Sequence, residues 1–420
     1  MPTETSTTYE PRDEAELGEI VTAALANGEP LDLIGGGTRD GLGRPTSAAT
    51  RVSLRAIEGI EAYEPSELFV AARAGTPLRL IIDLLDQHGQ ELAFEPIDYG
   101  QLYDGTRDGG TIGGLVATNA SGPRRIKAGA ARDHLLGFRA VSGRGEVFQS
   151  GGRVMKNVTG YDLSKLMAGA FGTLGILSTV TLKVLPKAEA RTTLAVVGLS
   201  DEAAVDLMTH VSGLPSEVSG LAHLPARLTM PNDARPLGTG AGPVTLLRLE
   251  GPNVSVRQRC NDLKEPIHAR IRKLDQSNAE IVELDDTATI DIWAAVRDCL
   301  QFAGTDDQVW RISTAPTEGA ALVADIKQSG VDVSNYFFDW AGGLVWLAVA
   351  PSEDASATAI RAAVDARGGH ATLVRAAATV RSAVPVFHPQ PQALAALSAR
   401  VKHSFDPERI LNRGRMRSDL

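Results

Sequence analysis

The chain has 420 residues, 43% of them hydrophobic and 22% charged, which is long enough for two or three domains and typical of a globular protein. Its net charge of −9 gives no basic surplus to neutralise phosphates, which argues against nucleic-acid binding and against direct docking on an anionic membrane. The two cysteines, Cys260 and Cys299, are too few for an iron–sulfur cluster or a structural zinc site. Without a signal-peptide pattern or an apolar run of membrane-spanning length, the chain is predicted to be cytoplasmic.

The first 187 residues alternate short β-rich runs with helical patterns and contain many glycines. The elements expected there, in chain order, are a helix over Asp13–Asn27, strands over Leu31–Ile34 and Leu68–Ala72, a helix from Pro77 to His88, and a strand over Glu91–Phe94. Gly28 is expected to end the first helix, and Thr76 to be the N-cap of the second.

After Lys187 longer strands and helices follow one another. The expected elements are a strand over Thr192–Leu199, a helix over Asp201–Val211 capped by Ser200, a strand over Val244–Leu249, a hairpin of Tyr336–Trp340 and Leu344–Ala350, a helix over Ser352–Ala366, and a strand over Ala371–Val374. This order predicts an α+β fold in which helices face an antiparallel sheet.

Three glycine-rich segments in the first part suggest a binding site for a long ligand. They are I-G-G-G-T-R-D from Ile34 to Asp40, G-G-T-I-G-G-L-V-A-T-N-A-S-G-P-R-R from Gly109 to Arg125, and the stretch from Gly151 to Leu177. The first fits neither the dinucleotide fingerprint, which would need glycine at Asp40, nor the P-loop, which would need Lys-Ser or Lys-Thr after the glycines. Successive backbone N–H groups of such segments can still bind a pyrophosphate.

These segments resemble the FAD-binding domain of the vanillyl-alcohol oxidase / p-cresol methylhydroxylase superfamily. More narrowly, they resemble the FAD-binding subunits of bacterial glycolate oxidases. The resemblance is carried by I-G-G-G-T, G-T-I-G-G-L-V-A-T-N-A-S-G-P-R-R, R-V-M-K-N-V-T-G-Y-D-L, G-T-L-G-I-L, W-R-I-S and F-D-P-E-R-I-L-N-R-G-R-M. It implies a PCMH-type FAD-binding domain of two subdomains over residues 1–187, an α+β cap domain with an antiparallel sheet over 188–395, and a segment over 396–420 that returns to the FAD domain.

The resemblance also assigns residues to the cofactor. Those expected at the pyrophosphate are Gly35, Gly36, Gly37 and Thr38, continued by Arg39 and Asp40; those expected at the flavin are Gly109, Thr111, Gly113, Gly114, Asn119 and Ser121; those expected at the adenine and ribose are Gly172, Thr173, Gly175 and Ile176. Lys156 and Asn157 are expected to be structural or near the ring, and Asp162 to be a helix N-cap. Since Leu31–Gly43 and Gly109–Arg125 contain no His or Cys, the FAD is expected to be noncovalent.

No catalytic set is evident in the sequence. The eight histidines stand singly, so no metal site is expected. Candidates near the flavin are His370 and His388, and Arg311 and Arg375 are candidates for binding a carboxylate, although a structural role is the more common one for each.

The family resemblance implies an FAD-dependent oxidoreductase that acts on the CH–OH group of a 2-hydroxy acid. As a subunit of a multi-subunit glycolate oxidase, the chain would help to convert glycolate to glyoxylate with a sister FAD-linked catalytic subunit and an iron–sulfur subunit. It would meet the membrane only through that complex. The alternatives are a stand-alone FAD-linked 2-hydroxy-acid dehydrogenase, for instance for D-lactate, and a scaffold with little bound flavin.

Overall fold

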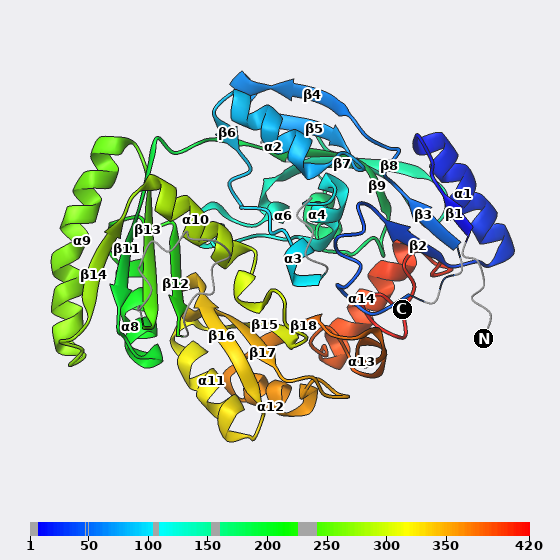
Figure 1. The fold of residues 1–420 in the computed structure, drawn as a ribbon. Coiled ribbons are helices and arrows are strands. Elements are labelled where there is room, and N and C mark those ends of the chain that lie inside the picture. The colour runs from blue at the N-terminus through cyan, green and yellow to red at the C-terminus, as the bar shows by residue number, and fades with distance from the viewer. Residues whose placement is uncertain (1–6, 47, 49, 104–108, 153–159, 226–241) are drawn as a thin grey trace.

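The computed structural model describes residues 7–46, 48, 50–103, 109–152, 160–225 and 242–420. Two antiparallel sheets organise this part of the chain (Figure 1). The first has five strands in the order β4 (Ile60–Glu64), β5 (Phe69–Arg73), β9 (Ile176–Lys183), β7 (Leu135–Val141) and β8 (Val147–Gly151). Helices α2 (Leu78–Gln87) and α4 (Ile112–Thr118) bury their apolar side chains in the same core as this sheet.

A smaller parallel sheet lies beside the first and carries the glycine loop. Its order is β1 (Thr7–Tyr9), β3 (Thr50–Ser53) and β2 (Leu31–Ile34), and α1 (Glu14–Asn27) packs its buried Leu17 and Val21 into the core of this sheet. The C-terminal segment, drawn red in Figure 1, follows α14 (Gln392–Phe405) back to this sheet, where Leu411 forms a parallel bridge with Leu31.

The second large sheet has eight strands from the later part of the chain. Their order is β14 (Glu280–Leu284), β11 (Ala190–Val197), β13 (Val244–Gly251), β12 (Gly220–Leu224), β16 (Val333–Asp339), β17 (Leu344–Val349), β15 (Gln308–Thr314) and β18 (Gly369–Arg375). Only the pair His223–Phe338 joins β12 to β16, so the sheet consists of two four-stranded halves. The helices α8 (Asp201–Ser212), α9 (Asn253–Lys273), α11 (Gly319–Gln328) and α12 (Ala357–Arg367) cover its outer face, and their side chains share one apolar core with the outer face.

The inner face of the eight-stranded sheet packs toward the five-stranded sheet. Val309, Phe337 and Trp346 on this face belong to the same apolar core as α2 and α4, and so does Trp293 of α10 (Asp286–Arg297). The smaller elements are β6 (Gln90–Glu91), β10 (Leu185–Pro186), α3 (Gly100–Tyr103), α5 (Arg125–Ala128), α6 (Ala131–His134), α7 (Leu163–Met167), α13 (Ala378–Ala383) and four 3₁₀ turns at Pro65–Glu67, Leu300–Phe302, Pro316–Glu318 and Trp340–Gly342.

The expected α+β class is confirmed, and most element positions agree with the sequence patterns, but three local predictions are wrong. Thr76 does not cap α2: its hydroxyl donates to the carbonyl of Arg73 at 2.6 Å and accepts from the N–H of Gly59, and Pro77 occupies the cap position. The strand expected over Glu91–Phe94 ends at Glu91, because a turn closed by the Glu95 N–H and the Leu92 carbonyl follows it.

The third difference is the helix expected from Ser352, which begins only at Ala357. The Asp354 carboxylate accepts hydrogen bonds from the Ser352 hydroxyl and from the backbone N–H of Ser356. These bonds hold the residues before Ala357 in a turn instead of a helix.

Candidate cofactor cleft

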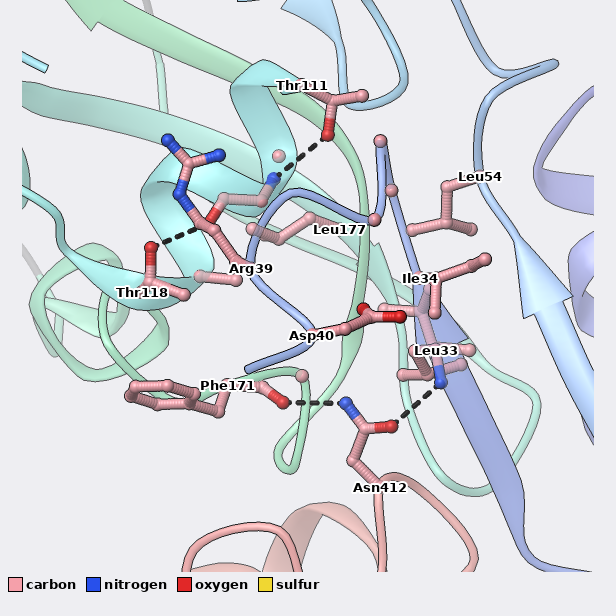
Figure 2. A pocket seen from close by; sticks show the side chains of 18 of the residues that line it. Leu33, Ile34, Arg39, Asp40, Leu54, Thr111, Thr118, Phe171, Leu177 and Asn412 are labelled. Atoms are coloured by element: carbon pink, nitrogen blue, oxygen red, sulfur yellow. Dashed lines mark hydrogen bonds between the residues drawn. The ribbon is translucent and has the colours of Figure 1, made fainter. Parts of the chain in front are cut away.

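The glycine-rich segments line one cleft between the small parallel sheet and α4 (Figure 2). The sequence-predicted residues that line it are Gly35, Gly36, Gly37, Thr38, Arg39, Asp40, Thr111, Gly113, Gly114, Gly172, Gly175 and Ile176. The structure thus brings together segments that are far apart in the chain.

The glycine loop after β2 offers backbone donors to the cleft. The N–H groups of Gly36, Gly37 and Thr38 donate to no acceptor among the described residues. Gly37 has a φ of +81°, a conformation that favours glycine. On the other side of the loop, the Arg55 guanidinium donates to the Gly36 carbonyl at 2.6 Å, which holds the loop in place. Successive N–H groups without partners are suited to an anion such as a pyrophosphate.

The glycines of the second segment pack so closely against their neighbours that a Cβ would not fit. A Cβ on Gly113 would lie 2.7 Å from the Ala74 Cβ and 2.8 Å from the Ala74 carbonyl oxygen, and a Cβ on Gly36 would lie 3.0 Å from the Gly110 Cα. Thr111 caps α4, since its hydroxyl accepts from the Gly114 N–H at 3.3 Å. Gly113 is therefore required for packing of α4, and Gly36 lies where the backbone of the first segment passes close to that of the second.

The C-terminal segment contributes a wall that the sequence-based assignment lacks. The Asn412 side chain accepts from the Leu33 N–H at 2.8 Å and donates to the Phe171 carbonyl at 2.7 Å, so it joins two sides of the cleft (Figure 2). Other lining residues that were not predicted are Leu33, Ile34, Leu54, Ala117, Thr118, Met167, Phe171, Leu177 and Arg415. The L-N in the tail motif was the signal for Asn412, but most of the others are apolar and carry no chemical signature.

Four predicted cofactor residues are not among those that line the cleft. The carbonyl of Gly109 accepts from the Arg39 guanidinium at 3.1 Å, and Asn119 forms the left-handed C-cap of α4. The Ser121 hydroxyl accepts from the Ala131 N–H, and the Thr173 hydroxyl donates to the Ala170 carbonyl at 2.6 Å. These contacts are structural supports of the cleft.

Charged side chains in the cleft are few. Burial raises the pKa of Asp40, and the positive charge of Arg415 opposes this effect. Arg39 donates from its other nitrogen to the Ile97 carbonyl at 3.1 Å, so it ties the glycine loop to the loop before α3.

The catalytic candidates have different environments. Arg375 donates to the carbonyls of Asp307, Leu102 and Phe302 and to the Thr305 hydroxyl. Its guanidinium thus joins the eight-stranded sheet, which we call the cap sheet, to α3. The His388 ring lies 3.0 Å from the Asp365 carboxylate and 3.3 Å from the Ala371 N–H.

Arg311 and His370 lie on two neighbouring strands of the cap sheet, β15 and β18. Arg311 has no hydrogen bond or ion pair among the described residues and stacks on Trp340. His370 is solvent-exposed on β18, and the protein atoms around it and the positive Arg311 lower its pKa. Asp162 accepts from the Lys165 N–H as the N-cap of α7, as predicted, whereas Lys156 and Asn157 lie outside the described residues.

Comparisons with known proteins identify the family of the chain. The family described as "FAD binding domain" matches residues 6–151. Glycolate oxidase subunit GlcE of Escherichia coli is 31% identical over 405 residues, which are 96% of this chain and 97% of that protein. The chain belongs to the GlcE family of glycolate oxidase subunits.

Other relatives of this GlcE-family chain share less of it. Glycolate oxidase subunit GlcD of Bacillus subtilis is 26% identical over 66% of the chain and 57% of its own length. Two solved structures, p-cresol methylhydroxylase with substrate bound and the 4-ethylphenol oxidase of Gulosibacter chungangensis, match with TM-scores of 0.66 and 0.69 over 97% and 98% of the chain and 88% of each of theirs, at 14% identity. The expected PCMH-type fold and the family resemblance are confirmed, and FAD is the cofactor of this GlcE-family chain.

Every helix among the described residues is too short or too polar to span a bilayer. Within the same part of the chain, no three His, Cys, Asp or Glu side chains come together in a way that could hold a metal ion.

Proposed function

We propose that the chain is the FAD-holding subunit of a multi-subunit glycolate oxidase, which converts glycolate to glyoxylate and sustains turnover only within the complex. The observation that carries this proposal is the match to E. coli GlcE, which extends over nearly the whole of both chains. The similarity to a GlcD subunit supports a related FAD-linked partner of the same oxidase.

The cleft supplies the means to hold the cofactor. The unpartnered N–H groups of Gly36, Gly37 and Thr38 would bind the pyrophosphate, and Asn412 would keep the walls of the cleft together. When bound, FAD supplies the hydride acceptor for oxidation of a CH–OH group. None of the described residues that line the cleft is His or Cys, which supports noncovalent binding.

Electrons must leave a reduced flavin before another turnover. Cys260 and Cys299, the two cysteines of the sequence, are both buried, and an iron–sulfur cluster uses about four thiolate ligands. An iron–sulfur partner subunit would therefore take the electrons and connect the complex to the membrane indirectly.

One alternative is a stand-alone D-lactate dehydrogenase. The D-lactate dehydrogenase of Archaeoglobus fulgidus is 29% identical, but over 48% of this chain and 44% of that protein. Because this match stops well short of both lengths, it supports the shared FAD-binding chemistry more than a shared substrate.

The test compares the chain purified alone with the chain co-expressed with the flavoprotein and iron–sulfur subunits of a glycolate oxidase. We expect a flavin absorption spectrum from the isolated chain and negligible steady-state oxidation of glycolate or D-lactate with an artificial electron acceptor. Glycolate oxidation should appear in the co-expressed complex. Sustained D-lactate turnover by the isolated chain would favour the stand-alone enzyme, and a colourless protein would favour the scaffold.

A further inference from the structure

The inner face of the cap sheet combines apolar side chains, such as Val309 and Trp346, with charged ones, such as Arg248. Along β15, Trp310 and Ile312 point into the outer core, while Val309 belongs to the core shared with the FAD domain. Alternation along the strand places Arg311 on this inner face. Its partner across the strand pair is Trp346, another member of the inner core.

Arg311 shares an aromatic platform with an arginine from the FAD domain. The guanidinium carbon of Arg311 lies 4.9 Å from the centroid of the Trp340 ring, and that of Arg125, the first residue of α5, lies 4.8 Å from the same centroid. Two cations from two different parts of the fold therefore meet at one indole ring.

Neither guanidinium has a hydrogen bond or an ion pair among the described residues, although both side chains are half-buried. The neighbouring Arg124 differs from them because it has ion-pair partners: its guanidinium lies 2.8 Å from both Glu91 and Glu250. The buried Nε1 of Trp340 also lacks a hydrogen-bond partner among the described residues.

The electrostatics of this group favour an added negative charge. Burial lowers the pKa of Arg311, and burial together with the positive charge of Arg311 lowers that of Arg125. The carboxyl groups that act on them, Asp339 on Arg311 and Asp133 on Arg125, form no ion pair with them. Burial raises the pKa of Asp339 to about 7, so its charge compensates Arg311 only partly near neutral pH.

The group lies near the cofactor cleft. Tyr99, whose ring centroid is 6.4 Å from that of Trp346, is within electrostatic range of both Arg311 and Arg39, and Arg39 lines the cleft.

We propose that Arg125, Trp340 and Arg311 form a binding site for the carboxylate of a small organic acid, between the FAD domain and the cap. A guanidinium fork matches the two oxygens of a carboxylate, and the site offers two such forks beside a flat apolar surface. The identification of this acid as a 2-hydroxy acid rests on the proposed function; the anion site itself does not.

The test is anaerobic calorimetric titration of the FAD-loaded full chain with glycolate, with ethylene glycol as the uncharged analogue. We expect glycolate to bind and ethylene glycol not to bind. Arg311→Met and Arg125→Met should each weaken glycolate binding by about tenfold to a hundredfold, because each removes charge-assisted hydrogen bonds. Arg400→Met, the same change at an exposed position of α14, should leave the affinity unchanged.

Two controls separate binding from folding and from the cofactor. The thermal unfolding midpoint of each variant should remain close to that of the parent, and Arg311→Lys should recover part of the affinity because it restores the charge without the fork. The proposal is overturned if the parent chain does not bind glycolate, if both methionine variants bind as the parent does, or if Arg311→Met loses FAD. Failure of the complex to oxidise glycolate would refute the proposed function and leave the binding result intact.

Discussion

Replacement of Glu95 by glutamine tests the charge network that joins the FAD domain to the cap. Glu95 accepts from both terminal nitrogens of Arg248 on β13, at 2.7 and 3.0 Å, and from the backbone N–H of Arg124 at 2.6 Å. These contacts, chiefly the charges of Arg248 and Arg124, outweigh burial and lower the pKa of Glu95 to about 2.

The magnitude follows from the pKa. The difference between about 2 in the native state and 4.5 in the unfolded state corresponds to about 3 kcal/mol of native-state stabilisation. Loss of one charge from a buried pair costs about 3–5 kcal/mol in general. Arg248 would keep Glu250 at 3.3 Å and its stacking on Trp293, so we expect the lower end, about 3 kcal/mol.

The assay is urea unfolding of the FAD-loaded chain, followed by circular dichroism, for the parent and Glu95→Gln at pH 7. Glu19→Gln, the same change at an exposed position of α1, is the control and should alter the free energy of unfolding by less than about 0.5 kcal/mol. A difference below about 1 kcal/mol for Glu95→Gln would refute the reasoning.

The same pair of proteins gives a pH dependence. Because the pKa of Glu95 is lower in the native state, its stabilising contribution is complete above pH 4.5 and is lost as the pH falls toward about 2. The stability difference between parent and variant should therefore be constant from pH 7 to 5 and should decrease below pH 4.5. A difference that shrinks between pH 7 and 5 would point to another titrating group.

Three further substitutions test the cleft and the segment that closes it. Lys402→Met removes the cation that donates to Asp406 at 2.6 Å and to the carbonyls of Thr173 and Leu411. It should therefore lower the free energy of unfolding in urea by about 3–5 kcal/mol, and a loss under about 1 kcal/mol would contradict this. Asn412→Ala leaves the Leu33 N–H and the Phe171 carbonyl without partners and should reduce the FAD retained after desalting, measured by visible absorbance, whereas full retention would show that this bridge does not hold the cleft. Gly113→Ala forces a Cβ against Ala74 and should lower both the unfolding midpoint and the FAD content. Gly28→Ala at the end of α1, where the Cβ meets open space, should cost only about 1 kcal/mol, from its positive φ, and equal losses in the two variants would contradict the packing argument.

Much of the cleft was predictable because glycine-rich loops leave a clear pattern in the sequence. The residues from Gly35 to Asp40 line the cleft as a continuous run, and Thr111, Gly113 and Gly114 lie across from them. The apolar walls, such as Leu54 and Leu177, could not be identified from the sequence, since nothing distinguishes them from ordinary core residues.

Contacts between distant segments set the limits of the prediction elsewhere. Arg311 and Arg375 had the same standing as sequence candidates, and only the fold shows that backbone carbonyls occupy the guanidinium of Arg375. Arg125 was visible in the second glycine-rich segment, but its meeting with Arg311 at Trp340 depends on the packing of the cap on the FAD domain. The turn that ends the strand at Glu91 likewise serves a tertiary purpose, because it presents Glu95 to Arg248.

The bridge from Asn412 to Leu33 spans 379 positions of the chain. During translation, the glycine loop and α4 leave the ribosome long before the residue that links the cleft walls has been made. A nascent chain that contains the whole FAD domain and the cap but not Asn412 still lacks this link. Tight cofactor capture is thereby deferred until both domains have been synthesised, so a ribosome that stalls in the cap should yield a polypeptide that holds FAD poorly.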